Sequence, residues 1–117
     1  MTITRINAGP RMSSIVINGN NVHLSGLTAA KREGRSVGEQ TGDILARVDE
    51  LLAQAGTSKE HLVQVNIWLS DISTFDEMNA VWDAWVMPGQ TPARATVEAR
   101  LALSDIKVEI QVLAALP

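Results

Sequence analysis

Apolar and polar side chains alternate in the second half of the chain, and this alternation restricts the fold more than any other sequence feature. It runs through Leu62–Ser70, Arg94–Leu101 and Ile106–Leu116. A period of two is typical of β-strands that bury one face and expose the other. The short connection Ala102–Asp105 predicts that the last two of these strands form an antiparallel hairpin.

The first of these strands illustrates how the two faces are assigned. The alternation predicts a buried face made of Val63, Val65, Ile67 and Leu69. It predicts an open face made of Leu62, Gln64, Asn66 and Trp68.

Three further strands are predicted near the start of the chain, over Ile3–Ile6, Ser13–Ile17 and Val22–Leu27. The second and third are separated by Asn18-Gly-Asn-Asn21. Gly and Asn readily adopt the positive φ angles that tight hairpin turns require. We therefore expect these two strands to form an antiparallel hairpin.

Two helices are predicted, each beginning at a capping box. Ser36-Val-Gly-Glu39 begins the first helix, which Gly56 ends, and Thr74-Phe-Asp-Glu77 begins the second, which Pro88-Gly89 ends. In a capping box, two side chains accept hydrogen bonds from backbone N–H groups that the helix leaves unpaired. The apolar stripe of the second helix is predicted to consist of Phe75, Met78, Trp82 and Trp85.

The order of elements is therefore βββαβαββ, which predicts an α+β fold. We expect a six-stranded, mostly antiparallel sheet with both helices on one face. With 117 residues, 45% of them hydrophobic, the chain is long enough for one domain with a packed core over residues 1–117. On the other face, polar residues are mixed with Leu62, Trp68 and Leu113, which indicates either a solvated surface or an oligomer interface.

Residue counts exclude several classes of chemistry. The chain has no Cys, so disulfides, thiol nucleophiles and thiolate metal sites are excluded. His23 and His61 do not have the spacing of paired metal ligands, so we expect no metal. A net charge of −3 argues against a nucleic-acid partner. Without a signal-like or membrane-spanning apolar run, the chain is expected to be cytoplasmic and to have no membrane partner.

The charged side chains of the predicted last hairpin are the remaining candidates for chemistry. Arg94 follows the turn Thr91-Pro-Ala93, and a planar guanidinium there can hold a carboxylate through two parallel hydrogen bonds. Glu109 shares the polar face of the predicted hairpin and can orient or activate a water. The same residues, with Glu98, Arg100 and Lys107, also fit cross-strand ion pairs worth under about 1 kcal/mol each. The pattern alone favours the ion pairs.

Four segments carry more information in combination: Ser25-Gly26, Asn79-Ala-Val-Trp-Asp-Ala-Trp85, Thr91-Pro-Ala-Arg-Ala-Thr-Val97 and Lys107-Val-Glu-Ile110. Together they resemble the RidA/YjgF family of reactive enamine/imine deaminases, also called RutC-like. The resemblance extends from about Ile3 to Ala115. The Trp-Asp-Ala-Trp segment and the Arg11-Met12 pair are most similar to the YoaB-like branch of that family.

The resemblance implies a chorismate-mutase-like fold and a homotrimer with pockets at subunit interfaces. It implies hydrolysis of 2-enamino or 2-imino acids, such as 2-aminoacrylate or 2-iminopropanoate, to 2-keto acids and ammonia, with no metal or organic cofactor. Arg94 then binds the substrate carboxylate and Glu109 positions the attacking water. The other substrate-binding residues that it implies are Ser25, Gly26, Asn79 and Thr96.

Two positions depart from the family pattern. Thr96 stands where many relatives have Cys, so any role of a thiol is absent while the strand geometry is kept. The Gly-Pro-Tyr of the family is here Gly9-Pro-Arg11, and the chain has no Tyr. The pocket wall formed by that Tyr must therefore differ, and Arg11 or Met12 can take its place.

Two other functions stay open at this point. One is ribonuclease activity or inhibition of translation, which some family labels carry; the acidic charge and few aromatic residues argue against it. The other is a trimer that binds small carboxylates in the same pocket without turning them over.

Overall fold

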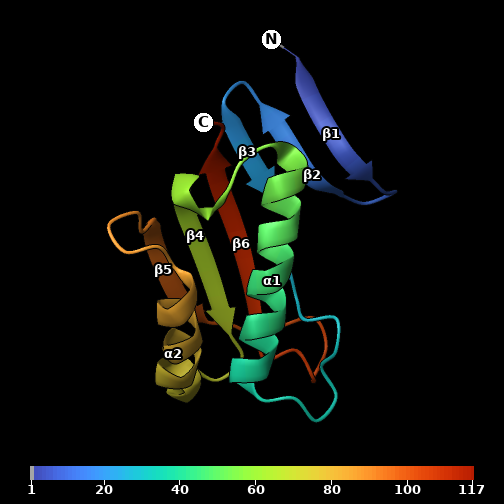
Figure 1. Cartoon of the computed structure of the whole chain (residues 1–117). Coiled ribbons are helices and arrows are strands. Elements are labelled where there is room, and N and C mark those ends of the chain that lie inside the picture. Colours follow the sequence, from blue (N-terminus) through green and yellow to red (C-terminus); the bar gives the residue numbers. More distant parts are fainter. Residues whose placement is uncertain (1) are drawn as a thin grey trace.

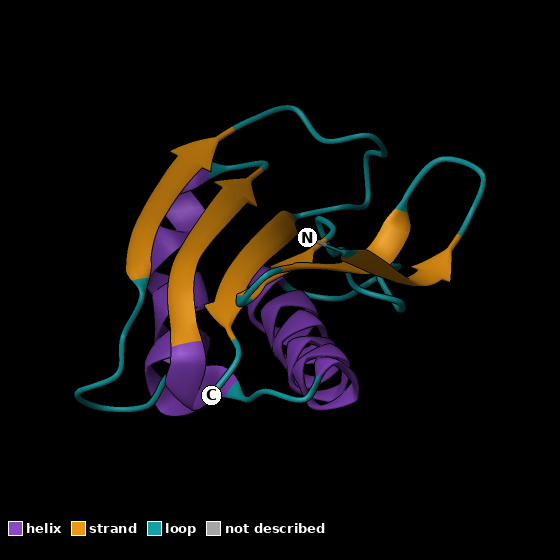
Figure 2. Cartoon of the chain, turned by 90° about the horizontal axis from the view of Figure 1, so that it is seen from above, coloured by secondary structure: helices purple, strands orange, loops and turns teal. Residues whose placement is uncertain are grey.

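The computed structural model describes residues 2–117, which form a six-stranded sheet with two α-helices on one face (Figures 1 and 2). The strands are β1 (Ile3–Ala8), β2 (Ser13–Asn18), β3 (Asn21–Leu24), β4 (Leu62–Leu69), β5 (Ala93–Glu98) and β6 (Val108–Ala115). The helices are α1 (Val37–Ala55) and α2 (Phe75–Trp85), and the short 3-10 turns are η1 (Lys59–His61) and η2 (Ile72–Thr74). The predicted order of elements and the α+β class are confirmed.

The strands are ordered β1-β2-β3-β6-β4-β5 across the sheet. The predicted hairpin of the last two strands is wrong, because β4 lies between β5 and β6. Strand β5 pairs in parallel with β4 after a crossover through α2, and a crossover is what parallel neighbours require. Residues 99–101 and 106–107 are not part of a strand, so the connection from β5 to β6 is long enough to pass β4.

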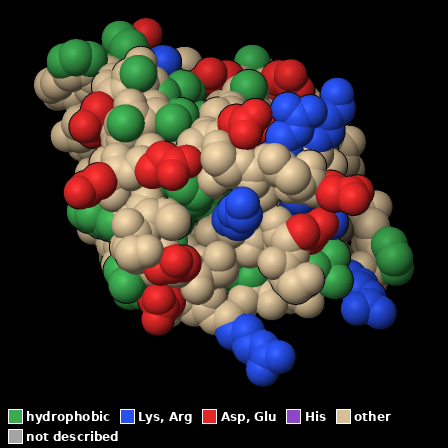
Figure 3. All heavy atoms as spheres, turned by 90° about the horizontal axis from the view of Figure 1, so that it is seen from below, with side chains coloured by type: hydrophobic (Ala, Val, Ile, Leu, Met, Phe, Trp, Pro, Cys, Tyr) green, Lys and Arg blue, Asp and Glu red, His purple; other side chains and the backbone are tan. Residues whose placement is uncertain are grey.

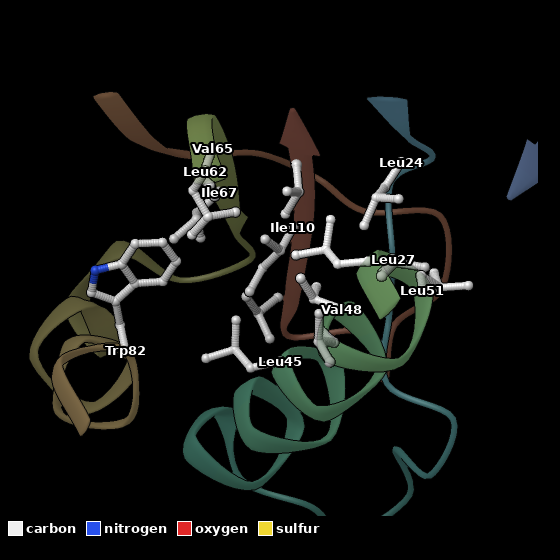
Figure 4. Packing of buried hydrophobic residues seen from close by; sticks show 14 of the residues in the cluster. Leu24, Leu27, Leu45, Val48, Leu51, Leu62, Val65, Ile67, Trp82 and Ile110 are labelled. Atoms are coloured by element: carbon white, nitrogen blue, oxygen red, sulfur yellow. The ribbon is translucent and has the colours of Figure 1, made fainter. Parts of the chain in front are cut away.

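One layer of apolar side chains between helices and sheet forms the core (Figure 4). From α1, Ile44, Leu45 and Val48 are almost completely buried; from α2, Met78 is buried and Trp82 turns its ring toward the sheet. Burying such side chains stabilises the fold by about 1.5–3 kcal/mol each. The sheet contributes Ile15, Val22, Leu24, Val65, Ile67, Leu69, Val108, Ile110 and Val112.

The ends of α1 are formed by the predicted residues. Ser36 Oγ accepts a hydrogen bond from Glu39 N, and Glu39 Oε1 accepts one from Ser36 N. At the other end, Gly56 has a left-handed conformation (φ 89°) that glycine adopts without steric cost. The predicted capping box and glycine stop of this helix are confirmed.

The capping box predicted for α2 is wrong. Thr74 ends the 3-10 turn that precedes the helix, and its hydroxyl donates to Asp71 O instead of capping α2. The carboxylate of Glu77 accepts a hydrogen bond from Gly38 N at the start of α1. Asp71 is the residue that caps locally, because its side chain accepts from Ser73 N at 2.9 Å. The two side chains of the predicted capping box therefore bond outside α2: Thr74 bonds to Asp71 and Glu77 bonds to the start of α1.

Strand β4 begins with an irregularity that changes which side chains are buried. The register against β6 shifts between Leu62 and Gln64. Leu62 is consequently buried and Val63 is 45% exposed, the reverse of the prediction for these two residues. A β-bulge of this kind shifts the alternation by one residue. From Val65 onward the predicted faces of the strand are correct.

Candidate functional site

Arg94 lies on the helix-covered side of β5, at the edge of the sheet. In the parallel register, Arg94 is the partner of Val65 and Thr96 is the partner of Ile67, and both partners are core residues. The neighbours Ala95 and Val97 are exposed on the other face. The alternation predicted the apolar residues of this strand beneath the helices, so its faces are reversed. Helix α2 covers the sheet beside β5 (Figure 1). Two aromatic rings of this helix lie close to the arginine.

The guanidinium of Arg94 is held by three side chains of α2. Its Nη1 donates a hydrogen bond of 2.8 Å to Oδ1 of Asn79. The Cζ atom lies 5.2 Å from the ring centroid of Trp82 and 5.8 Å from that of Phe75. Cation–π contacts at these distances favour a defined position for the cation. The helix therefore fixes where the guanidinium lies before any ligand binds.

No carboxylate neutralises Arg94 within the part of the chain that the structure describes. The ion pairs among residues 2–117 are Arg32–Asp105 and Arg35–Glu39. A guanidinium carries five N–H donors, and the amide of Asn79 accepts one of them. Two residues along the same face of β5, the buried hydroxyl oxygen of Thr96 has no hydrogen-bond partner. The edge of the sheet thus combines a half-buried, unpaired cation with a spare hydroxyl, which together suit a small anion.

Glu109 lies on the opposite face of the sheet, together with Ser25 and Gly26. It is the register partner of Trp68, whose side chain points away from the helices. Gly26 follows the end of β3, and the next residue, Leu27, forms a bridge with Ile110. A Cβ atom built on Gly26 would overlap Oε2 of Glu109 and would lie 3.3 Å from its Cδ. Residue 26 is therefore in direct contact with the carboxylate.

The structure separates the six predicted site residues into two groups. Arg94, Asn79 and Thr96 lie on the helix-covered side at the β5 edge, whereas Glu109 and the Ser25-Gly26 pair lie on or beside the open face. The prediction that Arg94 and Glu109 share one face is wrong. In the sheet they are separated by β4, whose Val65 is paired with Arg94 and whose Trp68 is paired with Glu109. Residues an odd number apart along a strand point to opposite faces.

The predicted surface ion pairs of the last two strands are also absent from the described residues. Glu98 Oε2 accepts a hydrogen bond from Ile72 N. The ammonium of Lys107 donates to the carbonyl oxygen of Arg35. Since β5 and β6 are not neighbours, their charged side chains have no cross-strand partners on each other. The interpretation of these residues as cross-strand ion pairs is therefore wrong.

A large hollow in the surface of the single chain lies away from the predicted site. A hollow of about 550 Å³ is lined by Ser70, Ile106 and residues 98–104, and none of the six site residues lies in it. On the face seen from below, acidic and basic side chains are interspersed (Figure 3). Arg11 and Met12 lie in the exposed β1–β2 turn, at the other end of the sheet from β5. They can line a pocket around Arg94 only from another copy of the chain.

Two aromatic contacts of the site, Phe75 and Trp82, belong to the predicted apolar stripe of α2. Trp82 is buried as that stripe predicts, whereas Phe75 is 37% exposed. The spacing 75, 79 and 82 places both rings and Asn79 on one side of the helix. That spacing, one polar residue between two aromatic residues, is the signal that indicates a cation-binding face.

Residues 2–117 contain neither a cluster of metal-ligating side chains nor a helix suited to crossing a membrane. The described residues contain no group of three His, Asp or Glu side chains arranged to hold a metal ion. Neither α1 nor α2 combines the length and the apolar character that crossing a bilayer requires.

In sequence and in fold, the chain is similar to one family of known proteins. The family model described as Endoribonuclease L-PSP matches residues 2–116. The RutC family protein YoaB of Escherichia coli K12 is 39% identical over 115 residues, which cover 98% of this chain and 99% of that protein. A RutC family protein of Haemophilus influenzae is 37% identical over 97% of this chain and 98% of its own length.

Solved structures lead to the same family. A member of the YjgF protein family from Neisseria meningitidis superposes with a TM-score of 0.96 at 43% identity, covering 100% of this chain and 97% of that one. The chain therefore belongs to the RidA/YjgF/RutC family, and the resemblance noted in the sequence is confirmed.

Proposed function

We propose that this protein is a metal-independent hydrolase that deaminates reactive 2-enamino and 2-imino acids to 2-keto acids and ammonia. Membership of the RidA/YjgF/RutC family supports the proposal. The observation that carries it is the state of Arg94. Its guanidinium is half-buried and fixed by Asn79, Phe75 and Trp82, yet it has no carboxylate partner among residues 2–117.

Arg94 suits the carboxylate that every 2-imino acid carries. Because the guanidinium is already positioned, little side-chain entropy is lost when a carboxylate binds to its free N–H groups. Two parallel hydrogen bonds to the carboxylate fix the adjacent C2 carbon, which is the carbon that water must attack. The free hydroxyl of Thr96 can bind a further polar atom of the same substrate.

The reaction requires one water and no change of oxidation state. An enamino acid first tautomerises to the imino acid. Water held by Glu109 then adds to C2, while its proton passes to the carboxylate and the C=N electron pair moves to nitrogen. Glu109 returns this proton to nitrogen, and the proton of the new hydroxyl group then passes to nitrogen as well. The C–N bond breaks with its electron pair on nitrogen, so ammonia leaves and the hydroxyl oxygen becomes the keto carbonyl oxygen. Imines hydrolyse slowly without help, so positioning accounts for the required acceleration.

A trimer with pockets between subunits is part of the proposal. Arg94 and Glu109 lie on opposite faces of one sheet, so they can contact one substrate only if two copies supply them. The open face also carries Trp68, Leu113 and the 50% exposed Val97. Covering these side chains stabilises an assembly by about 25 cal/mol per Å² of apolar surface. We infer that the open face of one copy brings Glu109 to the β5 edge of the next.

The direct test measures ammonia release from enzymatically generated 2-aminoacrylate, with and without this protein. The proposal predicts faster release that survives a strong metal chelator. Binding of 2-keto acids without faster release would instead support a carboxylate-binding trimer. Salt-sensitive cleavage of RNA without deamination would support the endoribonuclease named in the family description, against which the net charge of −3 argues.

A further inference from the structure

We propose that Gly26 is a positioning residue: the space left by its missing side chain is the space that the Glu109 carboxylate occupies. Residue 26 then determines the direction of the Glu109 carboxylate. This inference rests on the proposed function for its consequence in catalysis, whereas the contact itself is a feature of the structure.

The steric relation between the two residues is close. A Cβ atom on residue 26 would overlap Oε2 of Glu109 and would lie 3.3 Å from Cδ and 3.6 Å from Cγ. All three neighbouring atoms belong to the Glu109 side chain. The carboxylate thus lies directly against the Gly26 backbone, and an alanine at this position would have to displace it.

The backbone conformation of Gly26 does not itself require glycine. The glycines with positive φ angles in the described chain are Gly19, Gly34, Gly56 and Gly89. Gly26 is not among them, so an alanine can adopt its backbone conformation without strain. The feature that excludes a side chain here is therefore the carboxylate, not the backbone.

The backbone on both sides of the contact is fixed by hydrogen bonds. Leu27 N donates to Ile110 O at 2.8 Å, and Ile110 N donates to Leu27 O at 3.0 Å. On the other side, Ser25 N donates to Ser14 O at 3.1 Å. A substituent on residue 26 cannot be relieved by moving these strands without breaking paired groups. The flexible end of Glu109 must move instead, because rotating its side-chain bonds away from their preferred angles costs less than breaking these backbone hydrogen bonds.

The consequence is a selective effect on turnover. In the proposed trimer the substrate carboxylate is bound by Arg94 of a neighbouring copy, so a displaced Glu109 leaves that contact intact. A displaced carboxylate holds the attacking water in the wrong place, and misplacement by about 1 Å reduces rates by up to about a hundredfold. Gly26→Ala is therefore expected to lower kcat with little change in KM.

The experiment is a double-mutant cycle of Gly26→Ala and Glu109→Ala, read by deaminase kinetics and by thermal unfolding. In the protein that retains Glu109, Gly26→Ala should lower kcat about tenfold or more, with KM within about twofold, and should lower Tm. In the Glu109→Ala background the obstructing atoms are gone, so Gly26→Ala should change neither kcat nor KM further and should leave Tm equal or higher. Gly42→Ala in α1 is the matched control, since its Cβ would meet only Val81 at 3.9 Å.

Each other outcome has a defined meaning. Wild-type kcat in Gly26→Ala, or the same loss of kcat in both backgrounds, would overturn the proposal. A rise in KM of equal size in both backgrounds would overturn it in favour of a backbone contact with substrate. If the protein proves to have no deaminase activity, the Tm values of the four proteins in the cycle still test the contact between residue 26 and Glu109. A Tm loss confined to the protein that retains Glu109 supports steric control of the carboxylate and contradicts only the proposed function, whereas equal Tm changes contradict the contact.

Discussion

At the scale of single residues, the account depends on an arginine whose surroundings prepare it for a ligand. An exposed arginine on a sheet surface would sample many rotamers, and ordering it would cost about 1.5–2 kcal/mol. The amide of Asn79 and the rings of Phe75 and Trp82 hold the Arg94 guanidinium in place within the chain. The positive charge and the remaining N–H donors of the guanidinium then favour a planar anion such as a carboxylate.

Removing the guanidinium tests this role. Arg94→Ala is expected to reduce kcat/KM by an amount equivalent to about 2–5 kcal/mol, because the paired hydrogen bonds to the carboxylate are lost in a desolvated site. Arg94→Lys should restore little, since an ammonium cannot reproduce the planar fork. Arg47→Ala, which removes an exposed arginine of α1, is the control. Wild-type kcat/KM in Arg94→Ala would show that the family's carboxylate site is absent from this chain.

Glu109 is expected to act mainly on the chemical step. Glu109→Gln keeps the shape of the side chain and removes the charge that accepts a proton from water. Steady-state kinetics should show a large fall in kcat and little change in KM. A variant that loses affinity but keeps kcat would assign substrate binding to this residue instead of water activation.

At the scale of elements, a buried glutamine connects helix α1 to two loops. Gln40 is completely buried, and its Nε2 lies within hydrogen-bonding distance of the carbonyl oxygens of Arg32, Arg35 and Asp105. Its Oε1 accepts a hydrogen bond from Lys107 N at 3.0 Å. One side chain thereby links the loop before α1 to the segment that leads into β6 and Glu109.

Replacing this side chain with an apolar one of similar size should be costly. Gln40→Leu leaves buried backbone groups without partners, and we expect the free energy of unfolding to fall by about 2–4 kcal/mol. The free energy of unfolding is measured by chemical denaturation for Gln40→Leu and for the control Gln54→Leu, which changes an exposed residue of the same helix. Equal stability of the two variants would contradict a structural role for the buried network.

The N-terminal end of α1 should make stability depend on pH. Hydrogen bonds from the backbone and side chain of Ser36 hold the pKa of Glu39 below its ordinary value of 4.5, and Arg35 adds to this. A lowered pKa in the folded state means that the carboxylate stabilises the fold above pH 4.5. That contribution is lost as the pH falls through the lower folded-state pKa. The stability difference between wild type and Glu39→Gln, measured by denaturation across this range, should therefore shrink toward low pH. A difference that does not depend on pH would contradict the assignment.

Local signals predicted the elements better than they predicted the neighbours of each strand. Ser36, Glu39 and Gly56 define α1 because caps depend on residues close in sequence. The pairing of β5 with β4 depends on a crossover through α2 and on a loop that passes β4, and no short-range pattern encodes that. The prediction of the second capping box was wrong for the same reason, a contact distant in sequence. Glu77 accepts its hydrogen bond from Gly38 on the other helix.

At the scale of the whole molecule, the strand order determines whether Arg94 and Glu109 of one chain can act on the same substrate. The candidate residues Arg94 and Glu109 were recognisable from the sequence, but their faces were not, because the predicted hairpin placed them together. With β4 between their strands, the two side chains point to opposite sides of the sheet. The proposed active site is therefore an arrangement of copies, and light scattering should give a mass of three chains.

The most direct test of this claim mixes two strongly impaired variants. Subunits carrying Arg94→Ala and subunits carrying Glu109→Gln are given different tags and unfolded together. They are then refolded together, and assemblies that carry both tags are purified. In a closed trimer with sites between subunits, every mixed assembly reunites an intact Arg94 with an intact Glu109 at about one third of its interfaces. The account predicts that deaminase activity returns to about that fraction of wild type, although each variant alone keeps only a small residual activity. Mixed assemblies no more active than their parents would contradict it, since both residues would then have to act within one chain.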